Sequence, residues 1–230
     1  MRMPRTYTWA VGRSKVQGAT TSKIADKGGR YHHGDLRRAL VEAALELVTE
    51  HGPAGITLRE AARRAGVTHA APYRHFADKE ALLAAVAEEG FGRLRRETEE
   101  AMAGAAPEEL LEILGVVYVR FARRNPSQFR VMFGAEMGDK RRYPSLVEAD
   151  QSVFDLLCEA IRRAQAAGVV ASGSPARLGM VQWSMLHGVA ALVVDGQMER
   201  AGVREEHLDE FARRVARTGM AGLRQWPHAK

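Results

Sequence analysis

The sequence predicts an all-α protein of about nine helices, with an N-terminal three-helix helix-turn-helix domain followed by a larger helical bundle. Three observations support this fold class. Apolar residues recur at helical spacing over most of the chain. Glycine, proline and polar capping residues separate these segments. The nearest approach to a strand is Val169-Val170, which is too short to form a sheet.

The expected helices follow one another closely after a long N-terminal arm. They cover residues 35–51, 57–66, 67–76, 78–103, 108–124, 126–136, 144–168, 175–200 and 204–225. Asp35 is expected to cap the first helix. Thr57 and Glu60 have the spacing of a capping box, in which each side chain bonds the other's backbone N–H. Ser174-Pro175 combines a cap with proline in the first turn.

Composition and cysteine content are those of an ordinary globular protein. The chain has 230 residues, of which 46% are hydrophobic and 27% are charged. Its single cysteine, Cys158, cannot form an internal disulfide, so we expect a reducing cytoplasm. No uninterrupted apolar run reaches the length of a membrane span, so no membrane partner is expected.

The positive charge is concentrated at the N-terminus. Residues 1–30 contain seven basic residues and one acidic residue, which accounts for the whole net charge of +6. This segment is rich in Gly, Ser and Thr, and it is predicted to be a disordered basic arm. Such an arm favours contact with nucleic acid or another polyanion. A solvated tail without a function is the alternative.

Residues 57–76 have the spacing of a helix-turn-helix, in which the second helix enters the DNA major groove. Ala61 and Ala65 let the two helices approach closely. Gly66 permits the turn between them, and Thr68 is expected to cap the second helix. A pair of alanine-rich core helices without any DNA contact remains the alternative.

The run ITLREAARRAGVTHAAPYRHFADKEALLAAV resembles the DNA-binding domain of the TetR family of bacterial transcriptional regulators, over about residues 31–86. The run VQWSMLHGVAAL resembles the WHG-type C-terminal domain of a TetR subset, through Trp183, His187 and Gly188. The resemblance implies a head over residues 31–86 and a helical ligand-binding and dimerisation domain over residues 87–230.

The resemblance implies DNA contacts that the chemistry of the residues supports. A helix N-terminus and nearby donors would hold phosphates, here Thr57, Tyr73, His75 and Lys79. Methyl groups, histidine and arginine could contact base edges, here Thr68, His69, Ala70, Ala71 and Arg74. Phe76 is expected in the core, where it anchors the second helix.

Catalytic and metal-binding sites are not expected. His69 and His75 are six residues apart, so a helix would direct them to different faces. The glycine run at residues 90–93 lies inside a predicted helix and follows no strand. The sequence therefore predicts no metal, no cofactor and no enzymatic activity.

The helix expected over residues 175–200 is apolar on nearly all faces, so it should be buried on several sides. One of these sides could meet a second subunit. In the family that the sequence resembles, the last two long helices form a four-helix bundle with their symmetry mates. A homodimer through residues 175–225 is therefore expected. Its two recognition helices, spaced by about 34 Å, would read a palindromic operator.

The middle helices contain many aromatic residues, and the resemblance implies a ligand cavity among them. The candidate lining residues are Tyr118, Phe121, Phe133, Phe154, Trp183 and His187. An ordinary core without a ligand is the alternative, because Met and aromatic side chains also fill irregular cores.

These observations together predict a homodimeric transcriptional regulator that binds double-stranded DNA, in the form of a repressor controlled by an apolar small molecule. Two alternatives remain. One is a DNA-binding regulator without a small-molecule switch. The other is a helical small-molecule-binding protein or enzyme with a vestigial head. The sequence alone does not separate a repressor from an activator.

Overall fold

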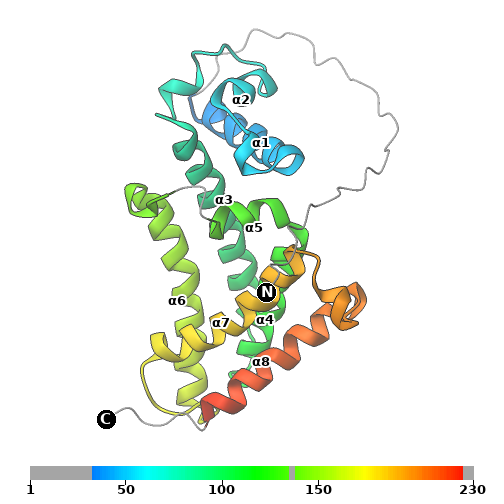
Figure 1. Ribbon diagram of the computed structural model, residues 1–230. Helices are drawn as coiled ribbons and strands as arrows, with labels where there is room; N and C mark the ends of the chain where they lie inside the picture. Colours follow the sequence, from blue (N-terminus) through cyan, green and yellow to red (C-terminus); the bar gives the residue numbers. More distant parts are fainter. Residues whose placement is uncertain (1–32, 135–137, 225–230) are drawn as a thin grey trace, which may run out of the picture. The chain divides into compact units, whose positions relative to one another are not determined.

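The computed structural model describes residues 33–134 and 138–224, and the basic arm expected over residues 1–30 lies outside them. The regular structure in these two ranges is entirely helical, which confirms the predicted fold class. The α-helices are α1 (His33–His51), α2 (Leu58–Arg64), α3 (Lys79–Met102), α4 (Leu110–Arg124), α5 (Pro126–Phe133), α6 (Pro144–Ala166), α7 (Pro175–Val194) and α8 (Leu208–Arg224) (Figure 1).

Side-chain caps set the start of α2, α3 and α7, the last through Ser174. The Thr57 hydroxyl accepts a hydrogen bond from the backbone N–H of Glu60 at 3.1 Å, as expected. The Glu60 carboxylate instead accepts from Arg63 Nε at 3.1 Å, so the acidic half of the capping box is replaced by an ion pair. Asp78 caps α3 by accepting from Ala81 N at 2.8 Å. Satisfying these backbone donors stabilises each first turn.

Several helix bounds differ from those expected. α1 begins at His33, two residues before Asp35, which was expected to precede the helix. α7 ends at Val194 and does not continue to residue 200. Gly196 follows with a φ of +65°, a left-handed conformation that favours glycine and ends the helix.

α3 connects the N-terminal helices with the rest of the described chain. It packs on α1 and also on α4, α5 and α6 (Figure 1). A Cβ atom at Gly90 would lie 2.6 Å from Met132 Sδ and 3.0 Å from Gln128 Cγ, so only glycine lets α5 come this close to α3. The glycine run at residues 90–93 is thus part of a helix, and Gly90 is a packing residue.

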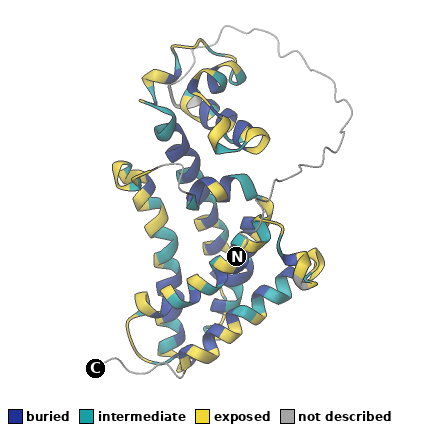
Figure 2. Ribbon diagram, viewed as in Figure 1, coloured by how far each residue is buried: buried dark blue, intermediate teal, exposed yellow. Residues whose placement is uncertain are grey.

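α7 packs on α4, α6 and α8, yet much of its apolar surface is not covered by this chain. Met180 and Leu192 are each 48% exposed, so this chain leaves one side of α7 uncovered (Figure 2). Among the described helices, α7 alone is long and apolar enough to cross a membrane, judged by length and composition only. Core helices of soluble proteins meet the same criterion.

Candidate functional site

The segment expected to form the second helix of the helix-turn-helix is not an α-helix. Residues 67–71 form a turn, and a short 3-10 helix follows at Pro72–Arg74. Ala71 N donates to Thr68 O at 3.0 Å and His75 N donates to Pro72 O at 2.9 Å, both with the spacing of a 3-10 helix. Pro72 has no N–H and cannot make the helical bond to Thr68 O. The prediction of a helix over residues 67–76 is therefore wrong.

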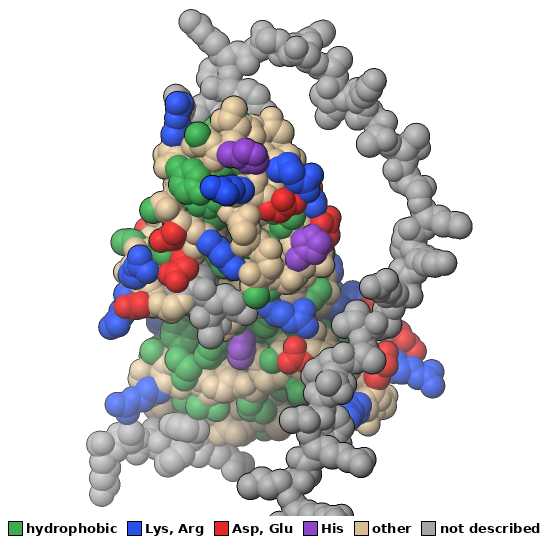
Figure 3. Space-filling model, turned by 45° about the horizontal axis from the view of Figure 1, so that its top comes forward, with side chains coloured by type: hydrophobic (Ala, Val, Ile, Leu, Met, Phe, Trp, Pro, Cys, Tyr) green, Lys and Arg blue, Asp and Glu red, His purple; other side chains and the backbone are tan. Residues whose placement is uncertain are grey.

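The turn segment nevertheless presents most of its side chains to solvent. Exposed side chains belong to Thr57, Thr68, His69, Ala70, Tyr73 and Arg74, whereas Ala71, His75 and Lys79 are half-buried. Tyr73 is 56% exposed, which is high for an aromatic residue. Figure 3 shows basic and histidine side chains beside apolar ones at the end of the molecule that carries α1 and α2. This surface can offer both hydrogen-bond donors and methyl groups to DNA.

Core packing holds the turn segment in place, and ion pairs fix the neighbouring α2. Phe76 is 3% exposed and lies in the core, with the guanidinium of Arg37 at 5.7 Å from its ring centre. Arg64 donates to Glu50 at 2.6 Å and to Glu46 at 3.1 Å, which ties α2 to α1. The Arg64 guanidinium lowers the pKa of Glu50.

Lys79 already has a partner within the protein. Its Nζ donates to the backbone carbonyl of Ala54 at 2.7 Å, and this bond connects the first turn of α3 with the loop before α2. An ammonium group has three donors. Two remain for a phosphate, so the expected DNA contact is compatible with this bond.

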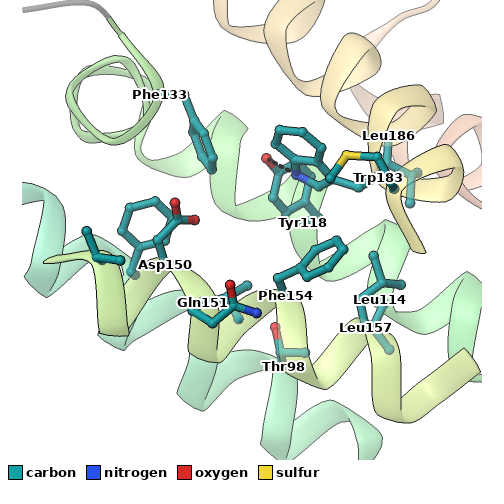
Figure 4. A pocket seen from close by; sticks show the side chains of 14 residues that line it. Thr98, Leu114, Tyr118, Phe133, Asp150, Gln151, Phe154, Leu157, Trp183 and Leu186 are labelled. Atoms are coloured by element: carbon teal, nitrogen blue, oxygen red, sulfur yellow. Dashed lines mark hydrogen bonds between the residues drawn. The ribbon is translucent and has the colours of Figure 1, made fainter. Parts of the chain in front are cut away.

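A cavity of about 320 Å³ lies between α3, α4, α5, α6 and α7 (Figure 4). It is lined by Phe91, Thr98, Leu114, Tyr118, Phe133, Val147, Asp150, Gln151, Val153, Phe154, Leu157, Met180, Trp183 and Leu186. Most of these side chains are apolar and five are aromatic. The volume lies near the lower end of the range for small-molecule sites, roughly 300–1,000 Å³.

Four of the six candidate ligand residues line this cavity, namely Tyr118, Phe133, Phe154 and Trp183. Phe121 does not, because it is fully buried in the core next to other apolar side chains. His187 is not a lining residue either, but it bonds to one. The sequence analysis missed Asp150 and Gln151, whose polar character suggested a solvated helix face.

Tyr118 is the centre of a polar group inside this aromatic cluster. Its hydroxyl lies 2.8 Å from Nδ1 of His187, and the indole N–H of Trp183 donates to it at 3.3 Å. The imidazole also stacks on Phe129 and meets Phe133 edge-on at a centre distance of 4.8 Å. Burial raises the pKa of Tyr118, so the phenol is neutral at physiological pH.

Asp150 is the only acidic residue that lines the cavity, and Lys140 is the nearest basic group that affects it. Desolvation by the pocket walls raises the pKa of Asp150, and the Lys140 charge lowers it in part. The Lys140 ammonium donates to Met132 O at 2.5 Å and lies 5.9 Å from the ring centre of Phe133. Burial lowers the pKa of Lys140.

The described residues contain no group of three or more His, Cys, Asp and Glu side chains that could hold a metal ion. His69 and His75 lie in the turn segment, where the backbone spacing is that of a 3-10 helix. The two candidate regions are thus an exposed turn segment suited to a polyanion and an apolar cavity.

Two sequence profiles match the chain, one over each of these regions. Residues 40–86 match a profile described as bacterial regulatory proteins, tetR family. Residues 111–218 match a profile described as a tetracyclin repressor-like C-terminal domain. The first covers α2 and the turn segment, and the second covers most of the cavity.

Individual proteins give the same relationship. The HTH-type transcriptional regulator BetI from Rhizobium meliloti (strain 1021) is 40% identical over 79 residues, which is 34% of this chain and 39% of that protein. The chain thus matches about two fifths of the length of this curated relative. A solved protein of unknown function from Rhodococcus sp. RHA1 is 35% identical, with a TM-score of 0.73 and coverage of 85% of this chain and 99% of that one.

A third relative shows the fold with a bound molecule. The transcriptional regulator FadR from Bacillus subtilis, solved in complex with stearoyl-CoA, has a TM-score of 0.64 at 18% identity. The similarity covers 80% of this chain and 98% of that one. Since both profiles, the exposed turn after α2 and the helical domain agree, the chain belongs to the TetR family of bacterial regulatory proteins.

Proposed function

We propose that this protein is a DNA-binding transcriptional regulator of the cytoplasm, a homodimeric repressor whose binding to a palindromic operator is controlled by an apolar small molecule. The observation that carries the proposal is the exposed turn segment after α2, in the region that matches the tetR-family profile. The cavity in the second region supports control by a small molecule. The protein acts by binding, without a catalytic step.

DNA contact would divide between phosphate and base groups. Thr57 caps α2, and its hydroxyl and the free backbone N–H groups of the first turn suit a phosphate. Tyr73, His75 and Lys79 would add phosphate contacts from the turn segment and from α3. Base reading would fall to four exposed residues of the turn segment, Thr68, His69, Ala70 and Arg74, and to the half-buried Ala71.

An exposed stripe on α7 supports the homodimer. Met180, Ser184, Gly188 and Leu192 are spaced by four residues and are all exposed, so they follow one side of the helix. A Cβ atom at Gly188 would meet no heavy atom within 4 Å. The stripe has apolar side chains at its two ends and the small residues Ser184 and Gly188 between them, so a second helix can approach closely. A second copy of the chain would cover Met180 and Leu192.

Ligand control would act through α3. This helix begins directly after the turn segment, and its residue Thr98 lines the cavity. A second connection runs from the residues just before α6, since Arg142 donates to Glu80 at 3.1 Å and the Tyr143 hydroxyl donates to the same carboxylate at 3.4 Å. A ligand acts only if it binds the two arrangements of these helices with different affinity.

The proposal is tested by fluorescence anisotropy with the DNA upstream of the protein's own gene and with random DNA of equal length. We expect a clear preference for the upstream DNA at moderate salt, and affinity that falls steeply as salt increases. Tyr73→Phe should weaken binding to all sequences about equally, whereas Thr68→Val should change the preferred sequence. Equal affinity for both DNAs would refute the proposal.

A regulator without a small-molecule switch is the second candidate. The cavity of about 320 Å³ speaks against it, because a tightly packed core leaves no space of that size. Affinity for the operator that no apolar compound changes would favour this candidate.

A further inference from the structure

Asp150 is an unusual group for an apolar pocket. It is the only acidic side chain among the lining residues, and no described residue forms a hydrogen bond or an ion pair with its carboxylate. Figure 4 shows it extending from α6 toward the side of the cavity where Phe133 lies. Asp150 is exposed to solvent in this chain, so its carboxylate stays partly hydrated and a ligand can reach it.

The walls around this carboxylate are aromatic. Phe91, Tyr118, Phe133, Phe154 and Trp183 all line the same cavity. The faces of aromatic rings carry partial negative charge and attract cations. The carboxylate and the ring faces therefore favour the same kind of ligand group, one that is positively charged.

We propose that the cavity recognises an apolar molecule with an amine or another cationic group, and that Asp150 is the counter-ion of that group. This inference rests on the proposal that the cavity holds the effector. The apolar body of the ligand fills the space between α4, α6 and α7, and its cation lies against Asp150. Binding pairs the carboxylate with a cation, since no side chain of the described residues contacts it directly.

The positive charge of Lys140 would favour an anionic ligand, but the position of this side chain limits that effect. Its ammonium is bonded to Met132 O, and among the described residues no ion pair joins it to Asp150. Lys140 is also absent from the cavity lining. A ligand anion could use the remaining donors of the ammonium. It would then lie near the Asp150 carboxylate, which the Lys140 charge already influences.

The test uses three probes of nearly equal size: 4-phenylbutylamine, 4-phenylbutan-1-ol and 4-phenylbutanoate. Their affinities for the full-length protein are measured by isothermal titration calorimetry at pH 7.5. We expect the amine to bind about tenfold more tightly than the alcohol, and the acid to bind most weakly. In Asp150→Asn the amine should lose this advantage, while the affinity for the alcohol stays the same.

Glu148→Gln is the matched control, because Glu148 is an exposed acidic residue on α6 that does not line the cavity. It should leave all three affinities unchanged. Equal affinity for amine and alcohol, or a preference that survives in Asp150→Asn, would overturn the inference. Tighter binding of the acid that is lost in Lys140→Met would assign the pocket to an anion instead.

The two proposals can fail separately. If none of the probes binds, the cavity is not an apolar ligand site and this inference falls with that part of the proposed function. If the probes bind as expected but the protein has no preferred DNA, the ligand assignment stands and the regulatory role is refuted. The anisotropy measurement on operator DNA is therefore made on the same protein samples.

Discussion

The Tyr118 hydroxyl and Nδ1 of His187 lie 2.8 Å apart, and they join α4 to α7. Because the Tyr118 oxygen accepts the indole N–H of Trp183, its own proton is free to be donated to His187. The imidazole is then neutral, with its proton on Nε2. Burial lowers the pKa of His187, and the nearby Lys140 charge lowers it further, which agrees with this assignment.

Removing the phenol hydroxyl should destabilise the protein. Tyr118→Phe leaves the Trp183 N–H and His187 Nδ1 without their shared partner. We expect a loss of about 1–3 kcal/mol in the free energy of unfolding, measured by urea denaturation. Tyr143→Phe is the control, because its hydroxyl makes only a long bond of 3.4 Å. Equal effects of the two variants would contradict the role assigned to Tyr118.

His187 should make the free energy of unfolding fall as the pH becomes more acidic. Its pKa in the folded protein lies below the ordinary 6.5, so the unfolded chain binds the proton more readily. The free energy of unfolding should therefore fall as pH drops from 6.5 to the folded pKa, and this contribution should be constant below that. Comparing the wild type with His187→Gln between pH 7.5 and 5 isolates it. Parallel curves would show that His187 does not contribute.

The contact between α3 and α5 should not tolerate a methyl group at Gly90. Gly90→Ala would press on Met132 Sδ and Gln128 Cγ, and such overpacking costs about 1–3 kcal/mol. Gly92→Ala, two residues further along α3, would meet only the flexible end of Arg96 at 3.6 Å. It should raise stability by about 0.5–1 kcal/mol, because alanine favours a helix. Thermal unfolding compares the two, and opposite signs are expected.

The proposed dimer predicts that Gly188→Leu prevents association without unfolding the chain. Within one chain nothing lies within 4 Å of the new Cβ, so helicity by circular dichroism should be unchanged. Sedimentation should change from twice the chain mass of 25.3 kDa to that mass alone. Arg38→Leu, an exposed position on α1, is the control that adds the same side chain elsewhere. A variant that stays dimeric would exclude this stripe from the interface.

Local signals predicted the helical framework well. The caps at Thr57 and Ser174 were identified from the sequence, because a hydroxyl before a helix bonds its first-turn N–H groups whatever the tertiary structure. The segment after Gly66 was harder to predict. Its composition suits an α-helix, but Pro72 lacks an N–H, and the backbone bonds donated by Ala71, Arg74 and His75 have 3-10 spacing. Only Phe76 N makes a bond of α-helical spacing there, to Pro72 O. Backbone bonding decided the outcome there, and side-chain periodicity did not.

The cavity could be predicted only in part. Helical spacing shows which residues point inward, but it does not show which inward face meets another helix and which meets an empty space. The sequence therefore predicted both Phe121 and Phe133 as ligand residues, although Phe121 lies in the core and Phe133 lines the cavity. Asp150 was missed for the opposite reason, since an acidic residue on an amphipathic helix usually indicates a solvated face.

α3 is a single helix of 24 residues, with Asp78 at one end and Thr98 near the other. At a rise of about 1.5 Å per residue, the twenty residues between them form a stiff lever of about 30 Å. Turning such a lever by about 5° moves its far end by about 2.6 Å. A ligand that displaces Thr98 slightly would thus reposition the turn segment by a distance comparable to a hydrogen bond, which is enough to break contacts with a base edge.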